Sequence, residues 1–224
     1  CGDGGKLSFN FADGSGTWRE VSTAAVMETG IWYHVAGSYD GDSVNVYING
    51  KLMATTLYTG TISPSSGLTA RIGDLANGGG RLFNGMIDEV RVWSTALDEN
   101  TLRDWMCRKL SASHPNHSNL EGNWKLDEDA GTTASDASPE SNAGTLTNGP
   151  TISLSEAVIG DSSIHTYGGT AVNLKSKYND ILEVSSITGS PSCFHIVVDY
   201  QPNPQPLAKG LSGQLDSTHH YSVF

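Results

Sequence analysis

The stretch WYHVAGSYDGDSVNVYINGK, residues 32–51, decides the fold class. Its first half is an extended, apolar-rich run that ends at Tyr39, and a second such run covers Val44–Ile48. The pair Asn49-Gly50 then separates the second run from a third. Two extended runs around Asn-Gly are the strongest short-range signal for a β-hairpin, because both central residues tolerate positive φ. The stretch therefore predicts antiparallel β-structure.

Short runs of the same kind continue on both sides of this hairpin and predict an all-β chain. They are Leu7–Phe11, Trp18–Val21, Leu68–Ile72, Met86–Trp93, Leu120–Leu126, Ala171–Leu174, Ile181–Val184 and Phe194–Tyr200. One helix is expected after Trp93, with Ser94 or Thr95 as its cap and the basic residues Arg108 and Lys109 near its end.

Composition and charge exclude several classes of partner. The chain has 224 residues, of which 26 are Gly and only 17% are charged, which suits strands joined by turns. The formal net charge of −11 argues against duplex nucleic acid and against anionic membrane surfaces, since both require a basic footprint. No apolar run approaches the length that spans a bilayer. Divalent cations and neutral sugars remain compatible partners.

The N-terminus and the cysteines give weaker indications about processing and disulfide bonding. The opening residues lack an initiator Met and do not form a signal peptide, so we expect a mature or excised segment of something longer. Cys1, Cys107 and Cys193 match no metal-ligand spacing. One disulfide with a free thiol, or three unpaired thiols, both remain open.

Four segments stand in an order that resembles the laminin-G-like, concanavalin-A-like jelly-roll superfamily, in the form common in large bacterial secreted or surface proteins. They are Trp32–Gly41, Val46–Lys51, Arg71–Gly73 and Phe83–Leu97. The resemblance implies a sandwich of two antiparallel sheets, an extracellular or cell-surface setting and, often, calcium or glycan binding. It does not imply one function, because jelly rolls host lectins, adhesion modules and glycosidases alike.

The resemblance also suggests how the chain is organised. We expect a laminin-G-like jelly-roll core at 1–112 that lacks its opening strands, a connecting strand with an acidic Gly/Ser/Thr loop at 113–150, and a small, truncated β segment at 151–224. The missing strands leave a gap near Leu7, Phe9 and Phe11. We expect Leu120–Leu126 to return to the sandwich with Trp124 packed inward, and the alternative is closure by other chains or by missing parts of the parent.

Catalysis is not expected. Glycosidic cleavage needs two carboxylates a few ångströms apart on one face of a cleft. Strict alternation along Met86–Trp93 places Asp88 and Glu89 on opposite faces of the strand. No nucleophile elbow, paired-His motif or P-loop is present.

Binding is the better hypothesis, and two kinds of site are candidates. An exposed aromatic ring can stack on a sugar face, and Trp18 and Tyr58 lie in or beside loops. Ca²⁺ takes six to eight oxygen ligands, which acidic loops supply. The resemblance implies a calcium ligand at Asp88 and another near the connecting strand, at Asp127 or Glu128. The following loop adds the acceptor oxygens of Asp136 and Asn142. The alternative is that Asp88 caps a turn and the loop is only solvated.

The sequence thus predicts a non-catalytic extracellular adhesion or recognition module of a large multi-domain surface protein, with Ca²⁺ as a candidate stabilising ligand. Its partners would be a glycan or a surface protein, and neighbouring domains or chains. Two alternatives remain: a carbohydrate-binding module of a polysaccharide-degrading enzyme, and an assembly subunit completed by strand exchange with a neighbouring chain.

Overall fold

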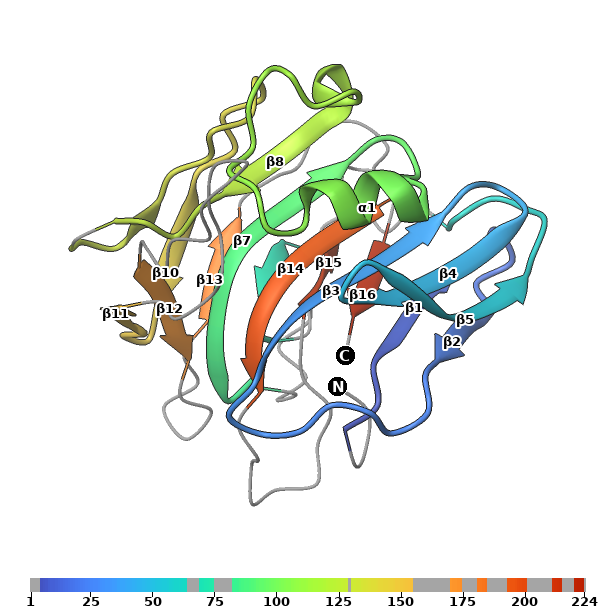
Figure 1. Ribbon diagram of the computed structural model, residues 1–224, viewed down its shortest axis with the longest axis horizontal. Helices are drawn as coiled ribbons and strands as arrows, with labels where there is room; N and C mark the ends of the chain where they lie inside the picture. Colours follow the sequence, from blue (N-terminus) through green and yellow to red (C-terminus); the bar gives the residue numbers. More distant parts are fainter. Residues whose placement is uncertain are drawn as a thin grey trace.

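Two antiparallel sheets stack on each other in the computed structural model, and one helix lies outside them (Figure 1). The structure describes residues 5–63, 69–74, 82–128, 130–154, 170–174, 181–184, 193–200, 211–214 and 220–223. The predicted fold class, an all-β jelly-roll sandwich with one short helix, is confirmed.

The first sheet contains, in spatial order, β2 (Trp18–Ser22), β1 (Ser8–Ala12), β16 (His220–Val223), β15 (Leu211–Gln214), β6 (Ala70–Ile72), β13 (Ile181–Val184), β10 (Gly144–Thr147) and β9 (Thr133–Ala134). The second contains β11 (Thr151–Leu154), β12 (Thr170–Leu174), β7 (Gly85–Trp93), β14 (Cys193–Tyr200), β3 (Trp32–Tyr39), β4 (Ser43–Ile48) and β5 (Lys51–Leu57). Strand β8 (Leu120–Trp124) also pairs with β7.

The register of the first sheet sorts residues into an apolar and a polar row, as a sheet with one face on the core requires. The apolar row runs Val21, Phe9, Val223, Leu211, Ile72, Leu182 and Leu146. The neighbouring polar row runs Glu20, Asn10, Ser222, Ser212, Arg71, Glu183 and Thr145. Phe9 and Ile72 are each 2% exposed and belong to the core between the sheets. The register of the C-terminal strands therefore agrees with the burial of the N-terminal ones.

The hairpin predicted at Asn49-Gly50 is confirmed. Asn49 and Gly50 have φ of 51° and 70°, and β4 pairs with β5 directly after them. The Asn49 side chain fixes the turn to the neighbouring strand β3, because its Oδ1 accepts a hydrogen bond from the His34 N–H at 3.0 Å. In return, the Asn49 N–H donates to the His34 carbonyl at 2.8 Å.

The gap predicted beside Leu7, Phe9 and Phe11 is closed from within the chain. β16 pairs with β1, and β14 lies between β3 and β7 in the second sheet. The predicted return of Leu120–Leu126 is also confirmed, because β8 pairs with β7 and Trp124 is 1% exposed in the core. Strands from all three predicted stretches thus share the same two sheets, while the boundaries at 112 and 150 stay predictions.

The helix α1 (Glu99–Trp105) begins later than the sequence predicts. Its N-cap is Asp98, whose Oδ1 accepts a hydrogen bond from the Thr101 N–H at 2.8 Å. The Ser94 side chain is turned elsewhere, because its hydroxyl donates at 3.2 Å, and its backbone N–H at 2.8 Å, to the Asn119 carbonyl at the end of the 3₁₀ turn η1 (His117–Asn119). Leu102 joins a second apolar cluster, which seats α1 on the outer face of the second sheet.

A β-bulge in β7 corrects the predicted pattern of that strand. Ile87 and Val90 are three residues apart, yet both are buried in the core between the sheets. Of the two residues between them, Glu89 has a φ of 50°, and the pairing with β14 shifts register at this point. The inserted residue breaks the period of two, so Asp88 and Glu89 share the outer face of the sheet. The prediction that they lie on opposite faces is wrong.

Candidate functional site

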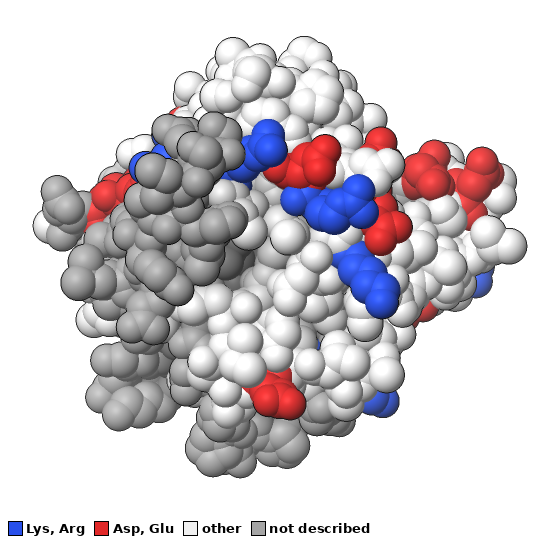
Figure 2. Space-filling view, viewed as in Figure 1, with Lys and Arg blue, Asp and Glu red and all other residues white. Residues whose placement is uncertain are grey.

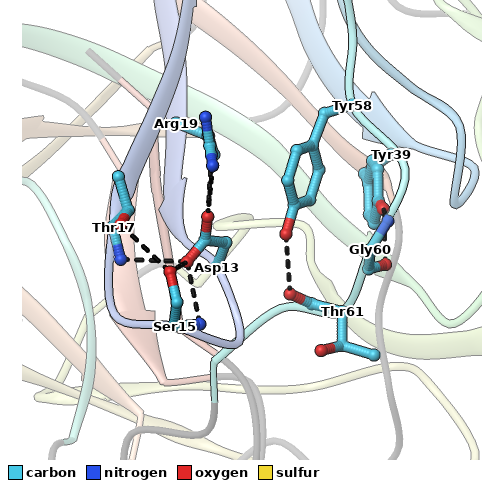
Figure 3. Close-up of polar contacts among 8 residues, drawn as sticks. All are labelled: Asp13, Ser15, Thr17, Arg19, Tyr39, Tyr58, Gly60 and Thr61. Atoms are coloured by element: carbon cyan, nitrogen blue, oxygen red, sulfur yellow. Dashed lines mark hydrogen bonds and ion pairs between the residues drawn. The ribbon is translucent and has the colours of Figure 1, made fainter.

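The turn that joins β1 to β2 is built around a buried carboxylate. Asp13 is 2% exposed, and its Oδ1 accepts hydrogen bonds from the Ser15 N–H at 2.9 Å, the Ser15 hydroxyl at 2.6 Å and the Thr17 N–H at 2.9 Å (Figure 3). Its Oδ2 accepts from Nε of Arg19 at 2.8 Å and from Nη2 at 2.7 Å. We call residues 13–19 the Asp13 turn. A single carboxylate thus fixes both its backbone and the direction of the guanidinium.

The charge on Asp13 is stabilised by these partners. The Ser15 hydroxyl has the largest effect, and the Thr17 N–H and the Arg19 guanidinium add to it. Together they hold the pKa of the carboxyl far below its usual range and outweigh the opposing effect of burial. The turn therefore stays charged and ordered across the physiological pH range.

Tyr58, a predicted ligand-binding residue, is built into the wall beside this turn. Its ring centroid lies 5.6 Å from that of Phe11 and 5.8 Å from that of Tyr39. The Arg19 guanidinium carbon lies 4.9 Å from the Tyr58 ring centroid, and the Tyr58 hydroxyl donates to the Thr61 carbonyl at 3.4 Å (Figure 3). Arg19 therefore covers one face of the Tyr58 ring, and Phe11 and Tyr39 pack beside it, so the ring is part of the packed structure.

Trp18, the second predicted ligand-binding residue, is strongly exposed. It lies in β2 opposite Ala12 and is 60% exposed. Successive residues of a strand point to opposite faces, so Trp18 projects away from the side on which Arg19 contacts Tyr58. The two predicted aromatic residues therefore flank Arg19 from different sides, and Trp18 is the one that a ligand in solution can reach.

The loop after β8 is organised by Asp136, one of the predicted calcium ligands. Its Oδ1 accepts hydrogen bonds from the Asn123 N–H at 2.7 Å and the Ser138 N–H at 2.8 Å. Its Oδ2 accepts from the Ser138 hydroxyl and the Asn142 N–H, both at 2.7 Å. The Asn142 carbonyl in turn accepts from Nε1 of Trp124 at 2.9 Å. This carboxylate fastens the loop to β8, and N–H and O–H donors occupy the positions that a cation would need.

The remaining predicted calcium ligands are Asp88, Asp127 and Glu128, and none of them is among the residues that donate these hydrogen bonds to Asp136. Asp88 is 2% exposed in β7, and Glu128 accepts a hydrogen bond from the Ser135 N–H at 2.6 Å through Oε1. Asp127 follows β8 by three residues. Within the part of the chain that the structure describes, no three His, Cys, Asp or Glu side chains lie close enough together to hold a metal ion. Asp136 does not fit a calcium ligand, and calcium binding stays a prediction.

Sequence reasoning missed a buried ion pair under α1. Arg91 is 0% exposed, and its Nη2 lies 2.7 Å from Oε2 of Glu89. The same guanidinium donates to the carbonyls of Trp105 at 3.3 Å and Arg108 at 2.8 Å, so it holds the C-terminal end of the helix. The sequence signal for this ion pair was an arginine and a glutamate two residues apart in a mainly apolar strand. The Asp13 turn had a weaker one, an Asp followed by Gly, Ser and Thr.

Among the described residues, no helix is long and apolar enough to cross a membrane. Neither a curated protein nor a solved structure matched this chain. A laminin G-type family model, described as the concanavalin A-like lectin/glucanases superfamily, matches residues 1–103. This segment contains the Asp13 turn, Trp18, Tyr58 and every strand from β1 to β7. The two-sheet fold and the family match agree, and together they support a laminin-G-like, concanavalin A-like domain in residues 1–103.

Proposed function

We propose that this chain is a non-catalytic extracellular recognition module and that it binds a glycan at the end of the sandwich formed by the Asp13 turn. The family supports a lectin-like or binding module, and its domains are generally extracellular. Adhesion as the biological role and a glycan as the ligand go beyond what the family supports and are part of the proposal.

The observation that carries the proposal is Trp18, whose indole is 60% exposed beside a rigid turn. Large aromatic side chains usually contribute to cores or interfaces, and an exposed indole offers a flat apolar surface for the C–H face of a sugar ring. The hydroxyls of Ser15 and Thr17, in the same turn, supply hydrogen-bonding groups next to Trp18. The turn is already ordered by Asp13, so binding would require little additional ordering.

The buried carboxylates support a non-catalytic role. Asp88 and Glu89 share a face of β7, but they are only 2% and 4% exposed. Glu89 is also paired with Arg91, and Asp13 is fixed by four hydrogen bonds and an ion pair. A glycosidase needs an acid and a nucleophile or base that both reach the substrate. None of these three carboxylates offers such access.

A glycan array followed by titration of the best ligand tests the proposal. Trp18→Ala should weaken binding about tenfold or more, since truncating a Trp that anchors a binding interface typically costs about 2 kcal/mol or more. Trp18→Phe should keep part of the affinity. Ile31→Ala is the matched control, because Ile31 is 43% exposed but lies outside the Asp13 turn. Unchanged binding by Trp18→Ala would show that the ligand binds elsewhere.

Calcium is a separate proposal. Its candidate side chains are Asp88, Asp127 and Glu128, because the oxygens of Asp136 are already engaged. Since these three do not form one cluster, backbone oxygens would have to supply most of the ligands. A ligand at about 100 times its Kd stabilises the folded state by nearly 3 kcal/mol. Thermal unfolding of metal-replete protein should therefore shift to lower temperature when EDTA is added. Identical thermal unfolding midpoints with and without EDTA would contradict calcium binding.

A further inference from the structure

Strand β5 forms one edge of the second sheet and is exposed along almost its whole length. Its one neighbour among the described strands is β4. Six of its seven residues are exposed, Ala54 is half-buried, and Leu57 reaches 86% exposure. An edge strand presents backbone N–H and C=O groups in the same geometry that pairs strands inside a sheet.

The first half of this edge is protected. The Leu52 N–H donates to Oε1 of Glu99 in α1 at 3.3 Å. The pairing with β4 then skips Met53, since Val46 lies opposite Ala54 and Tyr47 lies opposite Leu52. Both a covering side chain and a bulge are devices that stop an edge from pairing with another chain.

The second half, Ala54–Leu57, has neither device. The Tyr58 N–H donates inward to the Asp42 carbonyl at 2.8 Å. Backbone groups alternate in direction along a strand, so the N–H and C=O groups of Thr55 and Leu57 point away from β4. We call residues 54–57 the β5 edge. No strand or capping side chain covers it among the residues that the structure describes.

The β5 edge is also free of charge. No charged residue stands between Lys51 and Arg71 in the sequence. The edge strand of the other sheet, β2, carries both Arg19 and Glu20. Figure 2 shows charged side chains over and around α1, with further acidic side chains at the right-hand end of this face. Natural edge strands usually carry charges that oppose pairing, and here that protection is missing.

We propose that two copies of this chain associate through the β5 edge, as antiparallel strands related by a two-fold axis. The axis passes between Thr56 and Thr56 of the second copy, and Thr55 exchanges backbone hydrogen bonds with Leu57 of the second copy. A two-fold contact is self-complementary, so the same patch serves both copies. This register brings no like charges face to face and pairs β-branched residues across the axis.

The net charge of the chain gives the contact a distinctive salt dependence. Each copy carries a formal charge of −11, so two copies repel each other at long range while the edge itself is uncharged. Salt screens this repulsion with a Debye length of about 10 Å at 0.1 M. Dimerisation is therefore stronger at high salt. Association with a positively charged partner strand would instead weaken as the salt concentration rises.

Sedimentation equilibrium of the full chain tests the proposal. We expect a monomer–dimer equilibrium whose dissociation constant falls as NaCl rises from 20 to about 500 mM. Thr55→Pro removes an outward N–H without removing a bond to β4, and should weaken dimerisation at least tenfold. Thr55→Val, which keeps the N–H, is its matched control and should dimerise like the wild type.

A second variant covers the case in which Thr55→Pro does not fold. Leu57→Lys places a charge on the edge and should also weaken dimerisation at least tenfold, whereas Ile31→Lys should leave it unchanged. A monomer at all concentrations and salt conditions would overturn the proposal. So would a dimer that both edge variants leave intact, or one that weakens as salt rises. Glycan binding by Trp18 is measured independently of these outcomes.

Discussion

Two buried histidines are the single residues that respond most to pH. Burial, followed by the charge of Arg91, lowers the pKa of His34 to about 3. Burial lowers the pKa of His114 to about 4, with smaller effects from Arg91 and His117. The His114 ring stacks on Trp93, with 4.3 Å between centroids, and lies 4.7 Å from the ring of Trp105. Both histidines are therefore neutral in the folded state at neutral pH.

The first prediction is a loss of stability in mild acid. Both pKa values lie below the unfolded value of 6.5, so between pH 6.5 and about 4 the unfolded state binds more protons than the folded state. The stabilisation is complete above pH 6.5 and is lost as pH falls through this window. Urea unfolding at pH 7.5, 5.5 and 4.5 measures it. His114→Gln should flatten the slope, and an equally steep slope in that variant would exclude His114 as a source.

The second prediction concerns Gly37, whose missing side chain makes room for a core ring. A Cβ at this position would lie 2.7 Å from Cγ of Phe9 in the opposite sheet. Overpacking of a core typically costs about 1–3 kcal/mol. Gly37→Ala should therefore lower the free energy of unfolding by roughly that amount. The double variant with Phe9→Leu should recover part of the loss, and independent effects of the two changes would contradict the packing argument.

At the level of elements, the ion pair under α1 makes the third prediction. Removing one member of a buried pair is costly, because the other charge stays buried without compensation. Arg91→Ala should destabilise the fold by about 3–5 kcal/mol and release the end of α1. The double variant Glu89→Leu, Arg91→Leu should be markedly more stable than Arg91→Ala. Chemical denaturation measures both, and equal stabilities would show that the unpaired Glu89 is not the cause.

The strands that the sequence predicts best are those with local signals. The hairpin at Asn49-Gly50 follows from two adjacent residues, and the return of β8 follows from the alternation that ends in Trp124 and Leu126. The bulge at Glu89 could not be predicted in this way, because the positive φ is imposed by pairing with a strand about a hundred residues later. Local periodicity carries no information about such a partner.

The candidate site was predictable in part. The exposed position of Trp18 is consistent with its place beside a turn, but Tyr58 has one face of its ring covered by Arg19 from another strand. The hydrogen bonds of Asp136 likewise depend on Asn123 in β8, which the spacing within the loop does not reveal. Contacts between segments decided both roles, whereas composition suggested only that these residues were available.

For the whole molecule, the fourth prediction is that the N-terminal part does not fold alone. β14 lies between β3 and β7, and β16 pairs with β1. A fragment of residues 1–150 lacks both strands, so β1, β3 and β7 each lose a neighbour. It should show no cooperative thermal transition, whereas the full chain should show one. Circular dichroism and the dispersion of amide signals in NMR measure this, and a cooperatively folded fragment would restore the first 150 residues as an independent unit.

The position of β14 also determines when this protein can fold. A ribosome adds roughly 5–20 residues per second, so the hundred residues between β7 and β14 take about 5–20 s to make. During that interval β3 and β7 exist without the strand that joins them, and their apolar faces, including Val35 and Val90, have no complete partner sheet. Long-range pairing of this kind is slow and exposes aggregation-prone edges. The nascent chain therefore cannot complete its core until the residues of β14 have emerged, about a hundred residues after those of β7.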